Sequence, residues 1–155
     1  MAIEIERKFL VVNDGWRNSV VRVQHIRQGY IAHDGNRSVR IRRADEEAYI
    51  TVKGNRSGIS RQEFEYKIPV SDADEMLDKL CFHNVIEKIR HTVIYRDLTW
   101  QIDVFSGPEM GIVIAEVELT SVEQNIIAPD WAGEEVTRSE QHRNSSFIAR
   151  RGQKN

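Results

Sequence analysis

Cysteine is almost absent from this sequence, and long apolar runs are absent altogether. Cys81 is the only cysteine among 155 residues, which excludes an internal disulfide and any metal site built from several cysteines. No apolar run approaches the roughly 18 residues of a membrane-spanning helix, and no basic and apolar leader precedes Glu4. We therefore expect a cytoplasmic protein, in a reducing compartment, without a membrane partner.

An excess of charge of either sign is also lacking. The chain has 22 lysines and arginines against 24 acidic residues, which gives a formal net charge of −2 at pH 7. This balance gives no reason to expect nucleic acid as a partner, so any site for an anion must be local. With only three prolines and nine glycines, no linker or repeat divides the chain. We expect one domain over residues 1–155, able to bury about 70% of its unfolded surface.

What the sequence does contain is an alternation of apolar and polar residues at period two, the repeat of a β-strand. Eight segments follow it: Ile3–Val12, Gln24–Ala32, Ser38–Ala44, Ala48–Lys53, Ile59–Pro69, Ile86–Arg96, Leu98–Phe105 and Ile112–Thr120. Residues typical of turns or loops separate most of these strands, at His33–Asn36, Gly54–Gly58, Arg96–Asp97 and Ser106–Gly111.

Two segments depart from the strand repeat. Ser71–Phe82 begins with a helix-capping residue and places Met76, Leu77 and Leu80 at helical spacing, so it predicts a helix. Ser139–Arg151 predicts a second, C-terminal helix. Eight strands with mostly short connections and few helices favour a mainly β, α+β fold. We expect an eight-stranded antiparallel barrel, because closure removes the exposed strand edges.

Charged side chains recur at alternate positions of these strands, so on each strand they share one face. A solvated sheet face with cross-strand ion pairs would explain any one strand. Like charges, however, also stand two residues apart on the same face, which costs stability unless a bound ligand lies between them. These pairs are Glu4/Glu6, Arg40/Arg42, Glu63/Glu65, Lys88/Arg90 and Glu116/Glu118.

A barrel closed with the charged faces inward would hold both signs in its lumen. Paired carboxylates suit a divalent cation, and paired guanidinium or ammonium groups suit phosphate. Neither set tolerates burial alone, whereas Mg²⁺ coordinated by carboxylates and phosphate oxygens satisfies both. The pattern therefore predicts that the lumen binds a metal complex of an oligophosphate.

The same residues resemble the CYTH superfamily of triphosphate tunnel metalloenzymes, and its small bacterial inorganic triphosphatases in particular. "EIERKF" at Glu4–Phe9 resembles the Glu-x-Glu-x-Lys signature of that family. Later motifs follow in the family's order over nearly the whole chain: "VRIRR" at Val39–Arg43, "TVKG" at Thr51–Gly54, "RQEFEYKI" at Arg61–Ile68, "EKIR" at Glu87–Arg90, "QIDVF" at Gln101–Phe105 and "AEVEL" at Ala115–Leu119. The resemblance implies an eight-stranded tunnel that binds triphosphate with two ions of Mg²⁺ or Mn²⁺.

The resemblance also implies a role for each lumen residue. The phosphate-binding residues would be Lys8, Arg40, Arg42, Lys53, Arg61, Lys88 and Arg90. The metal ligands would be Glu4, Glu6, Glu63, Glu65, Asp103, Glu116 and Glu118. Catalytic roles would belong to Glu4, Glu6, Lys8, Tyr30 and Lys88, with Tyr30 near Lys88, and the C-terminal helix would close one mouth of the tunnel.

These expectations favour metal-dependent hydrolysis of inorganic tripolyphosphate to pyrophosphate and phosphate, because little chain remains to bind a base or thiamine. A class IV adenylate cyclase, a thiamine triphosphatase and another nucleoside triphosphatase stay open as alternatives. A non-catalytic barrel that binds polyphosphate or nucleotide is the alternative from another class. The apolar outer face leaves a homodimer open as well.

Overall fold

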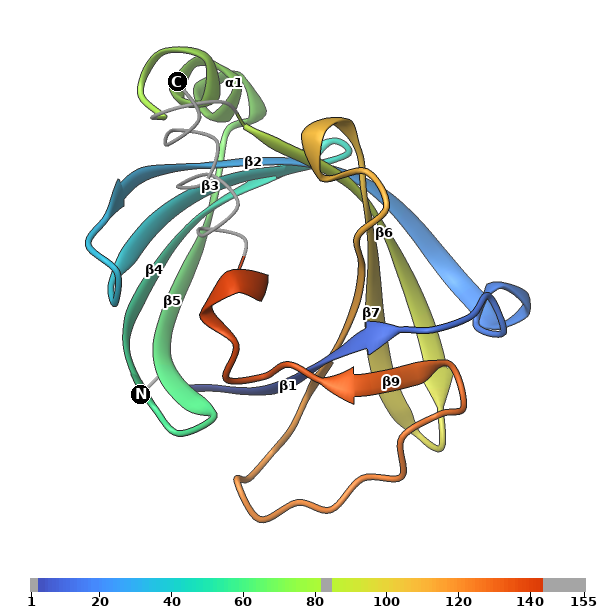
Figure 1. The fold of residues 1–155 in the computed structure, drawn as a ribbon. Helices are drawn as coiled ribbons and strands as arrows, with labels where there is room; N and C mark the ends of the chain where they lie inside the picture. Colours follow the sequence, from blue (N-terminus) through green and yellow to red (C-terminus); the bar gives the residue numbers. More distant parts are fainter. Residues whose placement is uncertain (1–2, 82–84, 144–155) are drawn as a thin grey trace.

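The computed structural model describes residues 3–81 and 85–143 as one sheet of nine antiparallel strands with a single α-helix (Figure 1). The strands are β1 (Ile3–Val11), β2 (Val20–His33), β3 (Ser38–Ala44), β4 (Glu47–Ser57), β5 (Ser60–Ile68), β6 (Ile86–Tyr95), β7 (Leu98–Phe105), β8 (Val113–Glu118) and β9 (Ala132–Glu135). The helix α1 spans Val70–Lys79, and short 3-10 helices η1, η2 and η3 span Arg17–Ser19, Gly107–Glu109 and Glu140–His142. None of the described helices is long and apolar enough to cross a membrane.

The sheet closes on itself through β1, so the predicted eight-stranded barrel is confirmed. Neighbouring strands follow the order β5-β4-β3-β2-β6-β7-β8-β1. The first residues of β1 pair with β5, with Ile3 opposite Gln62, and Glu6–Leu10 then pair with β8. Viewed along its axis, the barrel forms a ring of strands (Figure 1).

Several boundaries differ from the sequence predictions. The ninth strand, β9, was not predicted, because Ala132–Glu135 has no alternating pattern. It pairs with the later residues of β1, beyond Ile5, where the pairing of β1 with β5 stops. Residues Gly54–Ser57 were predicted as a loop, but a bulge between Lys53 and Arg56 carries β4 through them. The described residues of the predicted C-terminal helix include the 3-10 helix η3, and residues 144–151 of that helix lie outside the described part of the chain.

The principal apolar clusters lie outside the barrel wall. Phe9 and Trp131 pack against Trp100, with ring centroids 5.6 and 5.3 Å from the Trp100 ring. On another side, Ala73 and Leu77 of α1 pack with Ile41 and Ala48 of the wall. These contacts use the outward faces of the strands, which leaves the inward faces for the charged residues, as predicted.

A small apolar cluster lies inside the lumen. Phe105 stands opposite Lys88 in the β6–β7 register, and Ile86 shares the face of Lys88 two residues away. Both are fully buried with Tyr30 and Ile114. Tyr30 is close to the last residue of β2, and Phe105 is the last residue of β7. This cluster therefore lies toward the end of the barrel that carries the β2–β3 and β4–β5 hairpins. It forms an apolar wall beside Lys88.

Candidate active site

Strand register sets the predicted charged residues side by side in the lumen. Neighbouring strands place Lys8 opposite Glu116, Lys53 opposite Glu63 and Arg90 opposite Asp103. Residues directly opposite in antiparallel strands project to the same side of the sheet. The alternate charges of separate strands therefore form one continuous lining.

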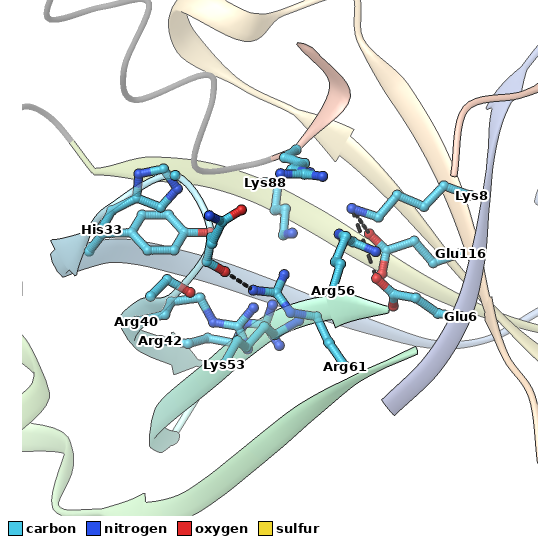
Figure 2. A pocket seen from close by; sticks show the side chains of 15 residues that line it. Glu6, Lys8, His33, Arg40, Arg42, Lys53, Arg56, Arg61, Lys88 and Glu116 are labelled. Carbon is cyan, nitrogen blue, oxygen red and sulfur yellow. Dashed lines mark hydrogen bonds and ion pairs between the residues drawn. The ribbon is translucent and has the colours of Figure 1, made fainter. Parts of the chain in front are cut away.

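The first part of this lining is a basic chamber (Figure 2). It lies toward the end of the barrel with the β2–β3 and β4–β5 hairpins. Among the described residues, two carboxylates line it, Glu6 and Glu116, together with Tyr30 and His33. The described cationic side chains that line it are Lys8, Arg40, Arg42, Lys53, Arg56, Arg61, Lys88 and Arg143. This excess of positive charge suits a polyanion.

The second part is an acidic chamber, which opens toward the β6–β7 turn. It is lined by Glu4, Glu6, Glu63, Glu65, Asp97, Glu116 and Glu118, with four cations, Arg40, Arg42, Lys53 and Arg90. Five residues line both chambers: Glu6, Arg40, Arg42, Lys53 and Glu116. The lumen thus joins a cationic compartment to an anionic one.

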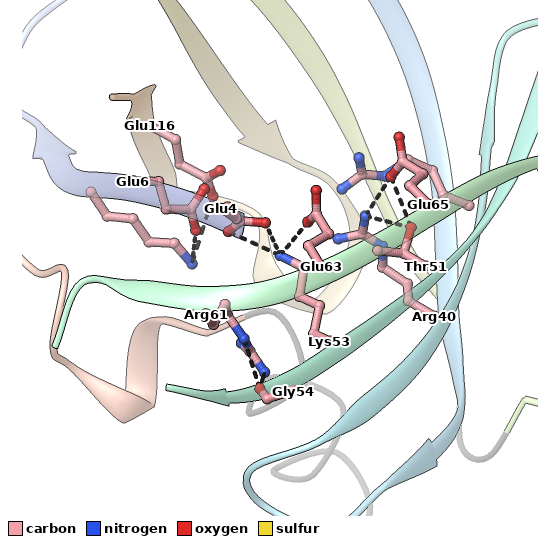
Figure 3. Close-up of polar contacts among 12 residues, drawn as sticks. Glu4, Glu6, Arg40, Thr51, Lys53, Gly54, Arg61, Glu63, Glu65 and Glu116 are labelled. Atoms are coloured by element: carbon pink, nitrogen blue, oxygen red, sulfur yellow. Dashed lines mark hydrogen bonds and ion pairs between the residues drawn. The ribbon is translucent and has the colours of Figure 1, made fainter. Parts of the chain in front are cut away.

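Ion pairs hold the junction between the chambers (Figure 3). Lys53 Nζ lies 2.9 Å from Glu4 Oε2 and 3.2 Å from Glu63 Oε2. Lys8 Nζ lies 3.6 Å from Glu116 Oε1 and more loosely contacts Glu6. Each lysine therefore sits between two carboxylates, where its ammonium group remains close to both chambers.

Two buried polar residues orient the lumen arginines, and sequence reasoning gave neither a role. Thr51 accepts a hydrogen bond from Arg40 Nη2 at 3.2 Å and donates one to Glu65 Oε2 at 2.8 Å. Gln28 accepts one from Arg42 Nε at 2.9 Å. Both are fully buried. A polar residue inside the alternation of Gln24–Tyr30 was the available signal for Gln28.

Asp103 lies between two cations at the back of the lumen. Arg90 binds both its carboxylate oxygens at 2.8 and 2.9 Å, and Lys88 Nζ lies 2.8 Å from Oδ2. Burial raises the pKa of Asp103, but Arg90 and Lys88 outweigh it and hold the pKa well below its ordinary value. Both oxygens contact cations in this structure, and metal ligation by Asp103 stays a prediction.

Burial also alters the cations of this group. It lowers the pKa of Lys88 to about 7 against the pull of Asp103, and the charges of Arg90 and Arg42 lower it further. Burial likewise lowers the pKa of Arg42 to about 9, with Arg40 and Arg90 adding to the effect. Lys88, only 2% exposed, can therefore exchange a proton near neutral pH.

Arg61 is anchored to the backbone at the edge of the basic chamber. Its guanidinium donates to the Gly54 carbonyl from Nε and Nη2, and Nη2 also donates to the Asn36 carbonyl at 2.8 Å. These bonds tie the β4–β5 hairpin to the β2–β3 hairpin. Its positive charge still lines the chamber, as predicted for a phosphate-binding residue.

The predicted site residues line the two chambers, with the exception of Asp103, which supports Lys88 and Arg90 from behind. Tyr30 and Lys88 line the basic chamber together, as expected. His33, Arg56 and Arg143 also reach this chamber and were missed. The bulge in β4 shifts the alternation by one residue, which hid Arg56 from a period-two reading.

The model of the CYTH domain matches residues 2–151. This chain belongs to the CYTH family. Two curated relatives are both named inorganic triphosphatase. One, from Acetivibrio thermocellus, is 44% identical over 96% of this chain and 94% of the relative. The other, from Nitrosomonas europaea, is 36% identical over 93% of this chain and 95% of the relative.

Solved structures agree with the CYTH assignment. A crystal structure of an inorganic triphosphatase is 33% identical, with a TM-score of 0.65 over 96% of this chain and 95% of that one. A Hippeastrum structure, described as an adenylyl cyclase with a dominant triphosphatase activity, is 14% identical, with a TM-score of 0.62 over 76% of this chain and 80% of that one. At that identity the Hippeastrum structure supports the fold alone.

The CYTH family uses divalent metal, and the acidic chamber has a donor set that fits it. Burial raises the pKa of Glu118, and the nearby carboxylates of Glu4 and Glu6 raise it further, so the local negative charge is incompletely compensated. Among residues 3–81 and 85–143, no three His, Cys, Asp or Glu side chains converge on one point as a preformed metal site. Mg²⁺ commonly takes only one or two carboxylates and completes its shell with phosphate oxygens and water. These acids therefore fit an ion that binds together with a phosphate ligand.

Proposed function

We propose that this CYTH protein hydrolyses the terminal phosphoanhydride of inorganic triphosphate, releasing pyrophosphate and orthophosphate. The observation that carries the proposal is the junction of the basic and acidic chambers, where Arg40, Arg42 and Lys53 meet Glu6 and Glu116. A triphosphate bound across this junction would place phosphate oxygens against the cations, and its terminal phosphate, together with bound metal, against the acids. Two relatives named inorganic triphosphatase support the choice of substrate.

In this proposal the chain's cations bind and orient the phosphates. Lys8, Arg40, Arg42 and Lys53 would bind the triphosphate, with Thr51 holding Arg40 in place. Arg90 braces Asp103, which positions Lys88 Nζ. With its pKa near 7, Lys88 Nζ can donate a proton as negative charge develops on the leaving pyrophosphate.

The acidic chamber would hold the metal. Glu4, Glu6, Glu63, Glu65, Glu116 and Glu118 are the proposed ligands, and we expect two ions of Mg²⁺ or Mn²⁺. When bound, such ions neutralise phosphate charge and lower the pKa of a coordinated water. Glu4 and Glu6 lie on the same face of β1 and can orient the attacking water toward the terminal phosphate.

The lining also favours a small inorganic substrate over a nucleotide. Among the described lining residues of the two chambers, Tyr30 is the only Phe, Tyr or Trp. A base or a thiamine ring would thus find little surface on which to stack. Leu98, Leu119 and Thr120 at the acidic mouth offer only small contacts.

Purified protein offered tripolyphosphate, ATP and thiamine triphosphate with Mg²⁺ or Mn²⁺ tests the proposal. We expect orthophosphate and pyrophosphate from tripolyphosphate, with a much lower rate for the other two compounds. Cyclic AMP and pyrophosphate from ATP would instead identify a cyclase. Tight binding of triphosphate without any product would identify a non-catalytic barrel, and preference for thiamine triphosphate or ATP would overturn the substrate.

The cellular setting and assembly belong to the same proposal. We propose that residues 1–155 act as one CYTH domain in the cytoplasm, with a small triphosphate as the partner and with neither nucleic acid nor a membrane. Val52, Phe64 and Tyr66 are exposed on the outer face of β4 and β5, which keeps a homodimer open. Light scattering of the purified protein measures its mass directly.

A further inference from the structure

A group of arginines lies at the hairpin end of the basic chamber. Arg56 of β4 and Arg61 of β5 are cross-strand partners next to the β4–β5 hairpin turn, and Arg143 directly follows η3. His33 and Asn36 also line the basic chamber, and the Asn36 carbonyl accepts a hydrogen bond from Arg61. We call these five residues the mouth cluster.

Among the described residues, the three arginines of the mouth cluster lack the close carboxylate partners that the lysines of the chamber have. Lys8, Lys53 and Lys88 each lie within 4.0 Å of a carboxylate. Among the residues that the structure describes, no carboxylate forms an ion pair with Arg56, Arg61 or Arg143. The undescribed residues 1–2, 82–84 and 144–155 include no Asp or Glu. The acids that act on these arginines, Glu4 and Glu6 on Arg61 and Glu140 on Arg143, therefore lie beyond ion-pair distance.

Two of these guanidinium groups also have an unmet hydrogen-bonding capacity. Arg56 Nε and Arg143 Nε are both buried, and neither has a hydrogen-bond partner among the described residues. A buried donor without a partner is costly, so it commonly indicates a missing acceptor. Both side chains line the basic chamber.

Mutual repulsion within the cluster points to the same acceptor. Burial lowers the pKa of Arg143, and the charge of Arg56 lowers it further, while Glu140 opposes the shift. For His33, burial lowers the pKa while Asp34 opposes and Arg143 and Arg61 reinforce the shift. A bound anion would relieve all of these interactions at once.

We propose that the mouth cluster is a separate phosphate-binding subsite, which takes the fourth phosphate of a linear inorganic polyphosphate. The inference rests on the proposed function, since the other three phosphates would occupy the junction of the chambers. The cluster lines the same basic chamber as Lys8 and Lys88, so a chain bound at the junction can continue to it. Guanidinium groups suit this role because their planar donors match phosphate oxygens.

The test compares tripolyphosphate and tetrapolyphosphate as substrates of Arg56→Gln and Arg143→Gln. Arg37→Gln is the matched control, because Arg37 is exposed and pairs with Asp34 outside the chamber. We expect kcat/KM for tetrapolyphosphate to fall roughly tenfold more than kcat/KM for tripolyphosphate in the two cluster variants, as for loss of a charge-assisted contact. Arg37→Gln should change neither value. Equal losses for both substrates, or no loss, would overturn the subsite.

Calorimetric binding without metal separates this inference from the proposed function. With EDTA present, the unmodified protein should bind tetrapolyphosphate more tightly than tripolyphosphate, and Arg56→Gln should lose that difference. If tetrapolyphosphate binds more tightly than tripolyphosphate in EDTA, but neither is hydrolysed when metal is present, the subsite stands and the proposed activity fails. If tripolyphosphate is hydrolysed and the difference is absent, the activity stands and the subsite fails.

Orthophosphate provides the last arm of the test, because a free phosphate has the same chemistry as the end of a chain. If the cluster serves only free phosphate, inhibition by orthophosphate should weaken in Arg56→Gln while both substrates keep their relative kcat/KM. That result would contradict the binding of a fourth phosphate. Equal melting temperatures of the variants and the unmodified protein exclude misfolding as the cause of any loss.

Discussion

At the scale of single residues, position in the lumen decides what each charge does. Asp103 has the same chemistry as the acids around the acidic chamber, but Arg90 and Lys88 occupy its oxygens. Lys88 in turn has its pKa lowered to about 7 by burial. A carboxylate that the sequence grouped with the metal ligands thus lies against two cations in this structure.

Removing the charge of Asp103 should therefore destabilise the protein. Asp103→Asn leaves Lys88 and Arg90 in the lumen without their countercharge, and breaking a buried ion pair costs about 3–5 kcal/mol. Urea unfolding measures this loss. Asp14→Asn is the control, because Asp14 pairs with Arg17 at the exposed surface and should change stability by less than about 1 kcal/mol. A small loss in Asp103→Asn would show that the buried network contributes little.

The same residue gives a dependence of stability on pH. Arg90 and Lys88 outweigh burial and keep the pKa of Asp103 below its ordinary value of 3.8, so its stabilising effect is present above that pH. This effect is lost as the pH falls toward the folded-state pKa. The difference in unfolding free energy between the unmodified protein and Asp103→Asn should narrow as pH falls from about 6 to about 3. A constant difference would contradict the account.

At the scale of elements, β1 completes the site because three strands share it. It pairs with β5 at Ile3–Ile5, with β8 at Glu6–Leu10 and with β9 at its end. After Ile5, β1 no longer pairs with β5, so the backbone groups on that edge of β1 need other hydrogen-bond partners. The segment at the end of β9 provides them, since Val136 N–H donates to the Lys8 carbonyl and Thr137 Oγ1 accepts from Lys8 N–H at 3.0 Å.

Replacing Thr137 by Val should disturb Lys8 from outside the lumen. The change keeps the side-chain shape but leaves the buried Lys8 N–H without its acceptor, which costs about 1–3 kcal/mol. Because Lys8 lines the basic chamber and pairs with Glu116, KM for tripolyphosphate should rise while kcat changes less. Thr137→Ser retains the hydroxyl and should restore both stability and KM. An unchanged KM in Thr137→Val would show that this contact does not position Lys8.

The alternation of charges predicted the lumen and its lining, and local signals predicted most strands. Neither signal could predict β9, because its four residues lack an alternation of apolar and polar residues and form a strand by pairing with the open edge of β1. The alternation also missed Arg56, since a bulge shifts the faces of β4. The distinct position of Asp103 depends on cross-strand register, which no single strand reveals. The roles of the lumen residues as metal ligands and phosphate contacts stay predictions.

At the scale of the whole molecule, the barrel inverts the usual arrangement of charge. Apolar residues pack outside the wall, and cations and acids divide the inside into two chambers. Either set alone would be unstable in a confined space. Placed end to end, they suit a ligand that is itself an anion bound to a cation.

This arrangement predicts that metal and phosphate binding can be separated. The cations of the basic chamber belong to the chain, so tripolyphosphate should still bind when EDTA removes divalent metal. Hydrolysis should stop, because the acids of the other chamber then have no ion to hold. Calorimetry and phosphate release measure the two effects. Hydrolysis that persists in EDTA would contradict a metal role, and complete loss of binding would contradict recognition by the basic chamber.

The most direct test of the central claim follows the oxygen of water during hydrolysis. Tripolyphosphate is hydrolysed by the purified protein with Mg²⁺ in ¹⁸O-labelled water, and ³¹P NMR locates the label in the products. Attack of water on the terminal phosphorus predicts label in orthophosphate and unlabelled pyrophosphate, in equal amounts. Label in pyrophosphate would show attack on the central phosphorus, and the absence of cleavage would contradict the proposed activity itself.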